Sequence, residues 1–213
     1  MSLRFLSKVF PWCALAVAAW AVTVPAEAAG DALRGKQLAY TCLGCHGIDT
    51  YKNVYPTYSV PKLRGQHPEY IVAALQEYAR SERSHATMHA HASSLSDQDM
   101  QDVAAYFSGE QVKSSGKGTV GTPPAAAAVC QACHGTDGVG IQGIYPTLAG
   151  QHADYIEQAL QSYRSGSRKN DIMQPFAQQL KPEEIRQVAE YYERQQPSLK
   201  VVPRFEKLTV AAK

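Results

Sequence analysis

Two stretches of the chain repeat the same spacing of apolar side chains, 85 positions apart. After Pro68 the apolar positions are 70, 71, 74, 75 and 78, and after Ala153 they are 155, 156, 159, 160 and 163. Such spacing predicts amphipathic helices that pack one face on a core. Ser96, followed by Asp99, and Pro182 suit the start of a second helix in each copy. No stretch alternates as a strand does, so the predicted fold class is all-α.

The repeat extends well beyond these helices. PKLRGQHPEYIVAALQEY, residues 61–78, aligns with PTLAGQHADYIEQALQSY, residues 146–163, and the same shift places Arg83 on Arg168. The chain is therefore a tandem duplication. We predict these boundaries: a signal peptide at 1–28, a first domain at 30–108, a linker at 109–124, a second domain at 125–196, and a C-terminal tail at 197–213. The linker is rich in Gly, Ser, Thr and Pro, and the basic tail is expected to be a disordered end.

Each copy opens with a CxxCH motif. Cys42, Cys45 and His46 form the first motif, and the second, 88 positions on, comprises Cys130, Cys133 and His134. A thioredoxin-like dithiol would need one CxxC beside a βαβ pattern, and a zinc site would need its four ligands close together. Haem attachment explains every position, because two thiols bind the haem covalently and the adjacent histidine binds the iron. The sequence therefore predicts two covalently bound haem c groups.

The N-terminus predicts export. Two basic residues precede an apolar run, and Ala26, Glu27 and Ala28 then fit a cleavage site. The alternative is a retained membrane anchor, but the run is short and is broken by Pro11. We expect a periplasmic protein that loses Cys13 with its signal peptide. The formal net charge of +2 gives no reason to expect nucleic acid as a partner.

The ordered motifs resemble the cytochrome c4 family. Both copies carry CxxCH, then P-x-L-x-G-Q, a helix with tyrosine, an M-x-x-x-A stretch and a final aromatic helix. The resemblance implies two tandem class I cytochrome c domains joined by a linker. Met88 and Met173 occupy equivalent places, in expected loops, and are the candidate sixth iron ligands beside His46 and His134. Met100 aligns with a helical position and is expected in the core.

Two features leave alternatives open. The stretch SHATMHAHA surrounds Met88 with histidines that are either solvated or compete for iron or for another metal. The G-Q-H motif and its tyrosine are the second feature. These side chains either hydrogen-bond haem propionates, lie at the domain interface, or have only structural roles, as partners of backbone groups and as core aromatics. The histidines around Met88 are His85, His89 and His91. The residues of the two G-Q-H motifs with their tyrosines are Gln66, His67, Tyr70, Gln151, His152 and Tyr155.

The predicted function is one-electron transfer, with no enzymatic activity of its own. The expected partners are redox proteins: a membrane quinol-oxidising complex as donor, and a terminal oxidase or other acceptor. One alternative is a cytochrome subunit of a periplasmic dehydrogenase, such as a flavocytochrome. Another, from a different class, is a dihaem peroxidase or thiosulfate-oxidising enzyme, which would need an iron with an open sixth position. Peripheral association with the membrane is left open.

Overall fold

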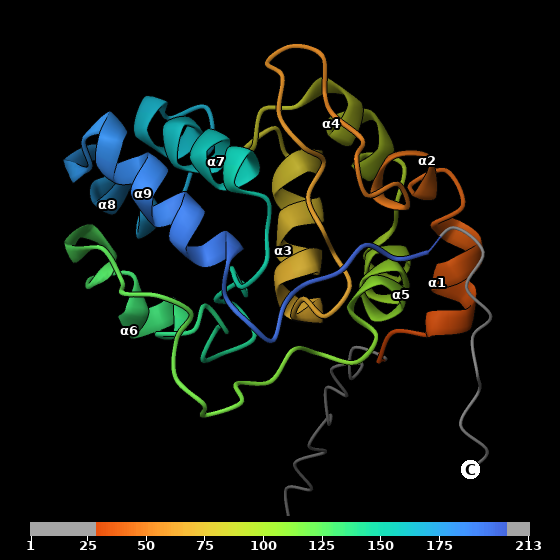
Figure 1. The fold of residues 1–213 in the computed structure, drawn as a ribbon. Helices are drawn as coiled ribbons and strands as arrows, with labels where there is room; N and C mark the ends of the chain where they lie inside the picture. The colour runs from red at the N-terminus through yellow and green to blue at the C-terminus, as the bar shows by residue number, and fades with distance from the viewer. Residues whose placement is uncertain (1–28, 204–213) are drawn as a thin grey trace, which may run out of the picture.

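The computed structural model describes residues 29–203, which form two helical bodies side by side (Figure 1). The predicted signal peptide and residues 204–213 lie outside the described residues. Within residues 29–203 there are helices and isolated β-bridges but no strand, so the all-α prediction is confirmed. None of the helices in this range combines the length and the apolar character needed to cross a bilayer.

The two bodies repeat one order of helices. In the first body the helices are α1 (Ala32–Leu38), α2 (Leu43–His46), α3 (Pro68–Ala79), α4 (Ala86–Ala92) and α5 (Asp97–Ser108). In the second they are the 3-10 turn η1 (Ala125–Ala127), α6 (Gln131–His134), α7 (Ala153–Ser165), α8 (Met173–Gln179) and α9 (Pro182–Glu193). Helices α3 and α7 are those that the apolar spacing predicts, and α5 and α9 are those that Ser96 and Pro182 predict.

Three of the long helices begin at residues that favour a helix start. Ser96 and Asp99 form a reciprocal capping box at the start of α5, and proline occupies the first position of α3 and of α9. The apolar face of each helix is then buried in its own domain. Each core has a pair of adjacent, almost fully buried aromatic rings on its last helix: Tyr106 and Phe107 on α5, Tyr191 and Tyr192 on α9.

The first domain has an element that the sequence analysis did not predict, the helix α1. It packs across α5, and Gly35 lies where an added Cβ would meet the Asp102 carbonyl oxygen. Asp102 accepts a hydrogen bond from the Asp31 backbone N–H (2.7 Å) and pairs with Arg34. In the second domain the short turn η1 precedes the cysteine motif instead. Met100 is 3% exposed in this core, as expected.

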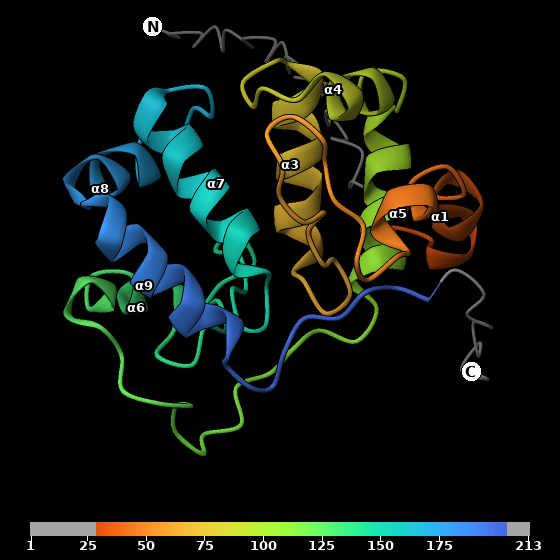
Figure 2. The ribbon, with the colours of Figure 1, turned by 45° about the horizontal axis from the view of Figure 1, so that its top comes forward.

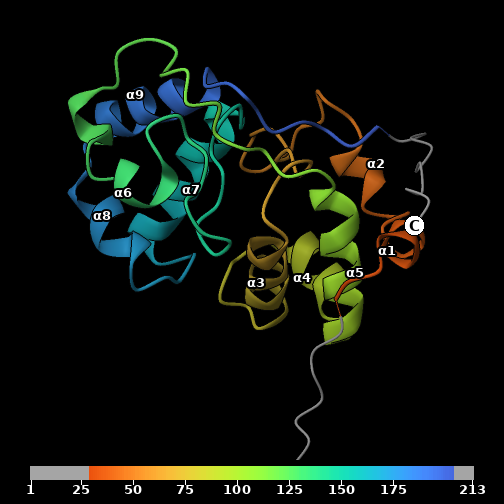
Figure 3. The ribbon, with the colours of Figure 1, turned by 90° about the horizontal axis from the view of Figure 1, so that it is seen from below.

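Two segments run between the bodies (Figures 2 and 3). Backbone hydrogen bonds connect both segments to the first domain. Residues 109–124 contain no helix, and the Val112 N–H donates to the Gly65 carbonyl. The segment after α9 returns to the first domain, where Lys200 exchanges two backbone hydrogen bonds with Arg64. Val202 is fully buried in the first domain's core. The expectation of a disordered end is therefore wrong up to Val202, because Val202 is buried in the core of the other domain.

Candidate functional site

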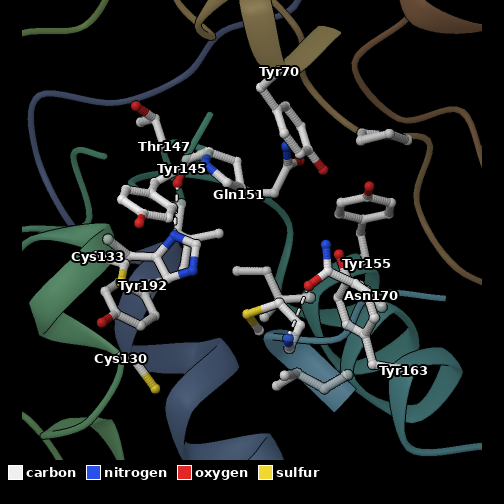
Figure 4. Close-up of a pocket in the computed structure, with 18 of the residues that line it drawn as sticks. Tyr70, Cys130, Cys133, Tyr145, Thr147, Gln151, Tyr155, Tyr163, Asn170 and Tyr192 are labelled. Atoms are coloured by element: carbon white, nitrogen blue, oxygen red, sulfur yellow. Dashed lines mark hydrogen bonds between the residues drawn. The ribbon is translucent and has the colours of Figure 1, made fainter. Parts of the chain in front are cut away.

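The second CxxCH motif lies on α6 at the wall of a cavity of about 290 Å³. Cys130, Cys133, His134 and Met173 all line this cavity, so the structure brings the predicted residues of the second domain together. Figure 4 shows the two cysteines on one side and Asn170 with Tyr163 on the opposite side. The cavity is near the lower end of the volumes usual for small-molecule sites.

The histidine of each motif is oriented by a backbone carbonyl. His134 Nδ1 lies 2.8 Å from the Pro146 oxygen, and His46 Nδ1 lies 3.0 Å from the Pro61 oxygen. Because a carbonyl only accepts, Nδ1 carries the proton and Nε2 keeps its lone pair for a metal. Burial lowers the pKa of both rings, to about 4 for His46. Both imidazoles are therefore neutral at pH 7, which is the ligand form.

The two methionines lie on short helices, whereas the sequence analysis expected loops. Met88 is inside α4 and Met173 is the first residue of α8. The Met173 N–H donates to Asn170 Oδ1 (2.9 Å), and the Met88 N–H donates to His85 Nδ1 (3.2 Å). His85 is therefore the counterpart of Asn170 as the polar cap that starts the methionine helix.

The histidines around Met88 already have protein partners in two cases. His85 Nε2 lies 3.2 Å from Asn53 Oδ1, and His89 Nδ1 lies 2.9 Å from the Tyr78 carbonyl oxygen. His91 is exposed. In the part of the chain that the structure describes, no three His, Cys, Asp or Glu residues form a metal cluster. Met88 packs against the first domain's core together with Cys42.

The G-Q-H motifs join the two domains. Gln66 Nε2 donates to the Thr147 carbonyl (2.9 Å), and its Oε1 accepts from the Thr147 N–H (2.9 Å). Gln151 repeats this pair of bonds with the backbone of Lys62. His67 Nε2 lies 3.1 Å from the Gly140 oxygen, across the same boundary. Of the readings left open, the structure favours the domain interface for these side chains.

Two buried arginines lie at this interface, and their role was not predicted. Arg168 donates to the Tyr70 hydroxyl (2.8 Å) and Arg83 donates to that of Tyr155, so each guanidinium reaches into the other domain. Arg83 and Arg168 are 7% and 4% exposed. Each also stacks on a tyrosine of its own domain, at 4.5 Å from Tyr78 and 4.3 Å from Tyr163. The only sign of this role in the sequence is that Arg83 and Arg168 occupy equivalent positions in the two copies.

The arginine of the second domain leaves one donor unused. Arg168 Nε is buried and has no hydrogen-bond partner, although Arg168 lines the cavity that holds the second cysteine motif. A buried donor without an acceptor costs about 1–3 kcal/mol. The cavity therefore suits an occupant that brings an acceptor, and a carboxylate is the strongest acceptor for a guanidinium.

Comparison with known proteins places the chain beside dihaem cytochromes. A family model described as cytochrome c matches residues 32–109, and one described as cytochrome c oxidase, cbb3-type, subunit III matches residues 125–191. Cytochrome c4 of Pseudomonas aeruginosa is 35% identical over 187 residues, which are 78% of this chain and 89% of that protein.

Two further relatives extend the comparison to structure and to partners. The crystal structure of reduced recombinant cytochrome c4 from Pseudomonas stutzeri superposes with a TM-score of 0.60 at 33% identity, covering 78% of this chain and 100% of that one. A thiosulfate dehydrogenase electron acceptor from Stutzerimonas stutzeri is 31% identical over 209 residues, which are 87% of this chain and 95% of that protein.

Proposed function

Because the chain belongs to the cytochrome c4 family of electron carriers, we propose that it carries single electrons in the periplasm. Its donor is a membrane quinol-oxidising complex and its acceptor is a terminal oxidase or another redox protein. The observation that carries this proposal is the duplicated set of residues. Each domain presents a CxxCH helix with an oriented histidine and a capped helix that bears a methionine.

The family relationship gives the chain two covalently bound haem c groups. The residues present fit them. The cysteines of the two motifs supply the thioether bonds, one pair to each haem: Cys42 with Cys45, and Cys130 with Cys133. Arg168 Nε, buried without an acceptor in the lining of the cavity that holds the second motif, fits a haem propionate.

The axial ligands in this proposal are His46 with Met88 in the first domain and His134 with Met173 in the second. The haem supplies an iron that gains or loses one electron reversibly. With these residues as its ligands, the iron would have no open coordination site for peroxide or another substrate. The carbonyl oxygens of Pro61 and Pro146 fix the histidine rings, and the caps of α4 and α8 fix the methionine backbones.

The domain interface also supports the proposed electron transfer. Gln66 and Gln151 tie the two domains together through backbone hydrogen bonds, and the Arg–Tyr pairs fill the space between α3 and α7. Tyr70 of the first domain lines the cavity of the second. The cavity at the second motif therefore borders the domain interface, and so does the cavity lined by Cys45 and Tyr155, which supports electron passage between the haems within one molecule.

A second candidate function is that of electron acceptor to a periplasmic dehydrogenase. The similarity to a thiosulfate dehydrogenase electron acceptor, over 95% of that protein's length, favours it. The haem sites, their axial ligands and the domain interface are the same in both proposals. Only the donor differs, so the two candidates are separated by the protein that reduces this one.

The test is a stopped-flow comparison of donors. We expect the purified oxidised holoprotein to be reduced rapidly by a quinol-oxidising complex with quinol, and then to be reoxidised by a terminal oxidase. Rapid reduction by thiosulfate dehydrogenase with thiosulfate, and slow reduction by the quinol-oxidising complex, would favour the second candidate. Catalytic turnover of peroxide or thiosulfate by the holoprotein alone would contradict both, because it requires an open or exchangeable iron ligand.

A further inference from the structure

The cavity of each domain is completed by a helix of the other domain. Tyr70, Ala73 and Glu77, on one face of α3, line the cavity that contains Cys130 and Cys133. The corresponding face of α7, with Tyr155, Gln158 and Ser162, lines a cavity of about 650 Å³ that reaches Cys45. Side chains of each domain therefore line a cavity that reaches the cysteine motif of the other domain.

The two completing faces differ in charge. Gln158 Nε2 donates to Ser162 Oγ (3.1 Å), so the face of α7 offers a neutral, hydrogen-bonded pair to the first domain's site. The equivalent positions on α3 are Ala73 and Glu77. Glu77 Oε2 is inaccessible to solvent and has no hydrogen-bond partner. Among the described residues that line either cavity, Glu77 is the one carboxylate.

Basic residues line both cavities, whereas this carboxylate lines only one of them. Lys62 and Arg168 line the cavity of the second domain, and Lys52, Arg83 and Arg168 line the other. A negative charge buried at low dielectric stabilises the more positive state of a nearby group, and ferric haem is more positive than ferrous haem by one charge.

On the proposed haem attachment at Cys130 and Cys133, we propose that Glu77 of the first domain lowers the reduction potential of the haem in the second domain. The first domain thus sets the driving force for electron exchange between the two haems. When the second haem is ferrous and the first is ferric, Glu77 favours the transfer of one electron from the second to the first. The second becomes ferric and the first becomes ferrous.

The test is a redox titration of the holoprotein by proton NMR, in which the haem methyl signals of the two domains are followed separately. In Glu77→Gln, which keeps the shape and removes the charge, the ferrous-to-ferric ratio of the second haem should rise about tenfold at a fixed solution potential. That ratio corresponds to a shift of about 59 mV for one electron. The first haem should shift much less. Glu69→Gln, an exposed change on the same helix, should move neither potential.

A reciprocal variant makes the test independent of how well Glu77→Gln folds. Ser162→Glu places a carboxylate at the equivalent position facing the first domain's site, and should lower the potential of the first haem. Unchanged potentials in Glu77→Gln, or equal shifts of both haems, would overturn the proposal. So would an unchanged first haem in Ser162→Glu. These failures leave the proposed function intact, because haem content and iron ligation are read separately from the optical spectrum.

Discussion

Two glutamines show how single side chains join the domains. Gln66 and Gln151 each use both ends of the amide on the backbone of one residue in the other domain. Thr147, the partner of Gln66, is 1% exposed. A side chain that both donates and accepts satisfies the buried N–H and the buried carbonyl of its partner together. Each glutamine therefore favours one position of the two domains relative to each other.

Replacing Gln66 should weaken the interface measurably. We expect Gln66→Ala to lower the free energy of unfolding by about 2 to 4 kcal/mol, because it leaves two buried backbone groups of Thr147 without partners. Urea denaturation measures this loss. Gln187→Ala, on the exposed face of α9, is the matched control and should change stability by less than about 0.5 kcal/mol. Equal stability of the two variants would show that the Gln66 bonds contribute little.

At the residue scale, the sequence predicts haem roles for the cysteines, histidines and methionines but gives no role to the arginines. CxxCH has a fixed chemistry at a fixed spacing, so its meaning is local. Arg83 and Arg168 also repeat, but a buried guanidinium between tyrosines depends on which helices meet across the interface. Two equivalent arginines in the sequence do not reveal that contact.

At the scale of elements, the long helices were predictable and the short ones were not. Helices α3, α5, α7 and α9 have 12 or 13 residues, enough for an apolar stripe to repeat. The methionine helices α4 and α8 and the N-terminal helix α1 have 7 residues each. Helices this short depend on capping and on tertiary contacts, which apolar spacing does not show.

The contact between α1 and α5 should depend on pH through Asp102. Burial raises the pKa of Asp102, but hydrogen bonds from the Asp31 N–H, Gln98 and Arg34 outweigh it and leave the pKa below its ordinary value. A depressed native pKa stabilises the fold above the unfolded pKa of about 3.9, and this contribution is lost as the pH falls through the native value.

The corresponding measurement compares wild type with Asp102→Asn between about pH 6 and pH 3. The wild type should be the more stable protein at pH 6, and the difference should shrink as the pH falls below about 4. The urea midpoint at each pH gives the comparison. A difference that stays constant down to pH 3 would show that the Asp102 charge is not what holds α1.

The segment after α9 is an element whose role lies in the other domain. Val202 is fully buried in the first domain's core, although it follows the last helix of the second. We expect Val202→Ala to destabilise the first domain by about 1.5 kcal/mol, from the two methyl groups lost. Hydrogen exchange should rise in α1 and α5 and stay unchanged in α7 and α9. Val201→Ala, at a partly exposed position, is the control. Faster exchange in α7 and α9 would contradict this assignment.

At the scale of the whole molecule, the sequence predicts two domains but not their arrangement. The duplication follows from identical residues at a constant shift. Equivalent residues of the two copies, such as Gln66 and Gln151, form the interface, but their repetition does not show which surfaces meet. The first copy also has three more residues between its motif and Pro61, and the loop 51–60 that contains them reaches the second domain through Lys52 and Ser59, which bind Asp154. Contacts of this kind are visible in the structure and cannot be predicted from the sequence pattern.

The central claim is that two irons, each closed by histidine and methionine, make this protein an electron carrier. The most direct test is the near-infrared sulfur-to-iron band of the oxidised holoprotein, compared among wild type, Met88→Ala and Met173→Ala. We expect each substitution to remove about half of the band, because each methionine binds one of two irons. A band unchanged in Met88→Ala would contradict the claim and would assign the first iron to a histidine or to an open site.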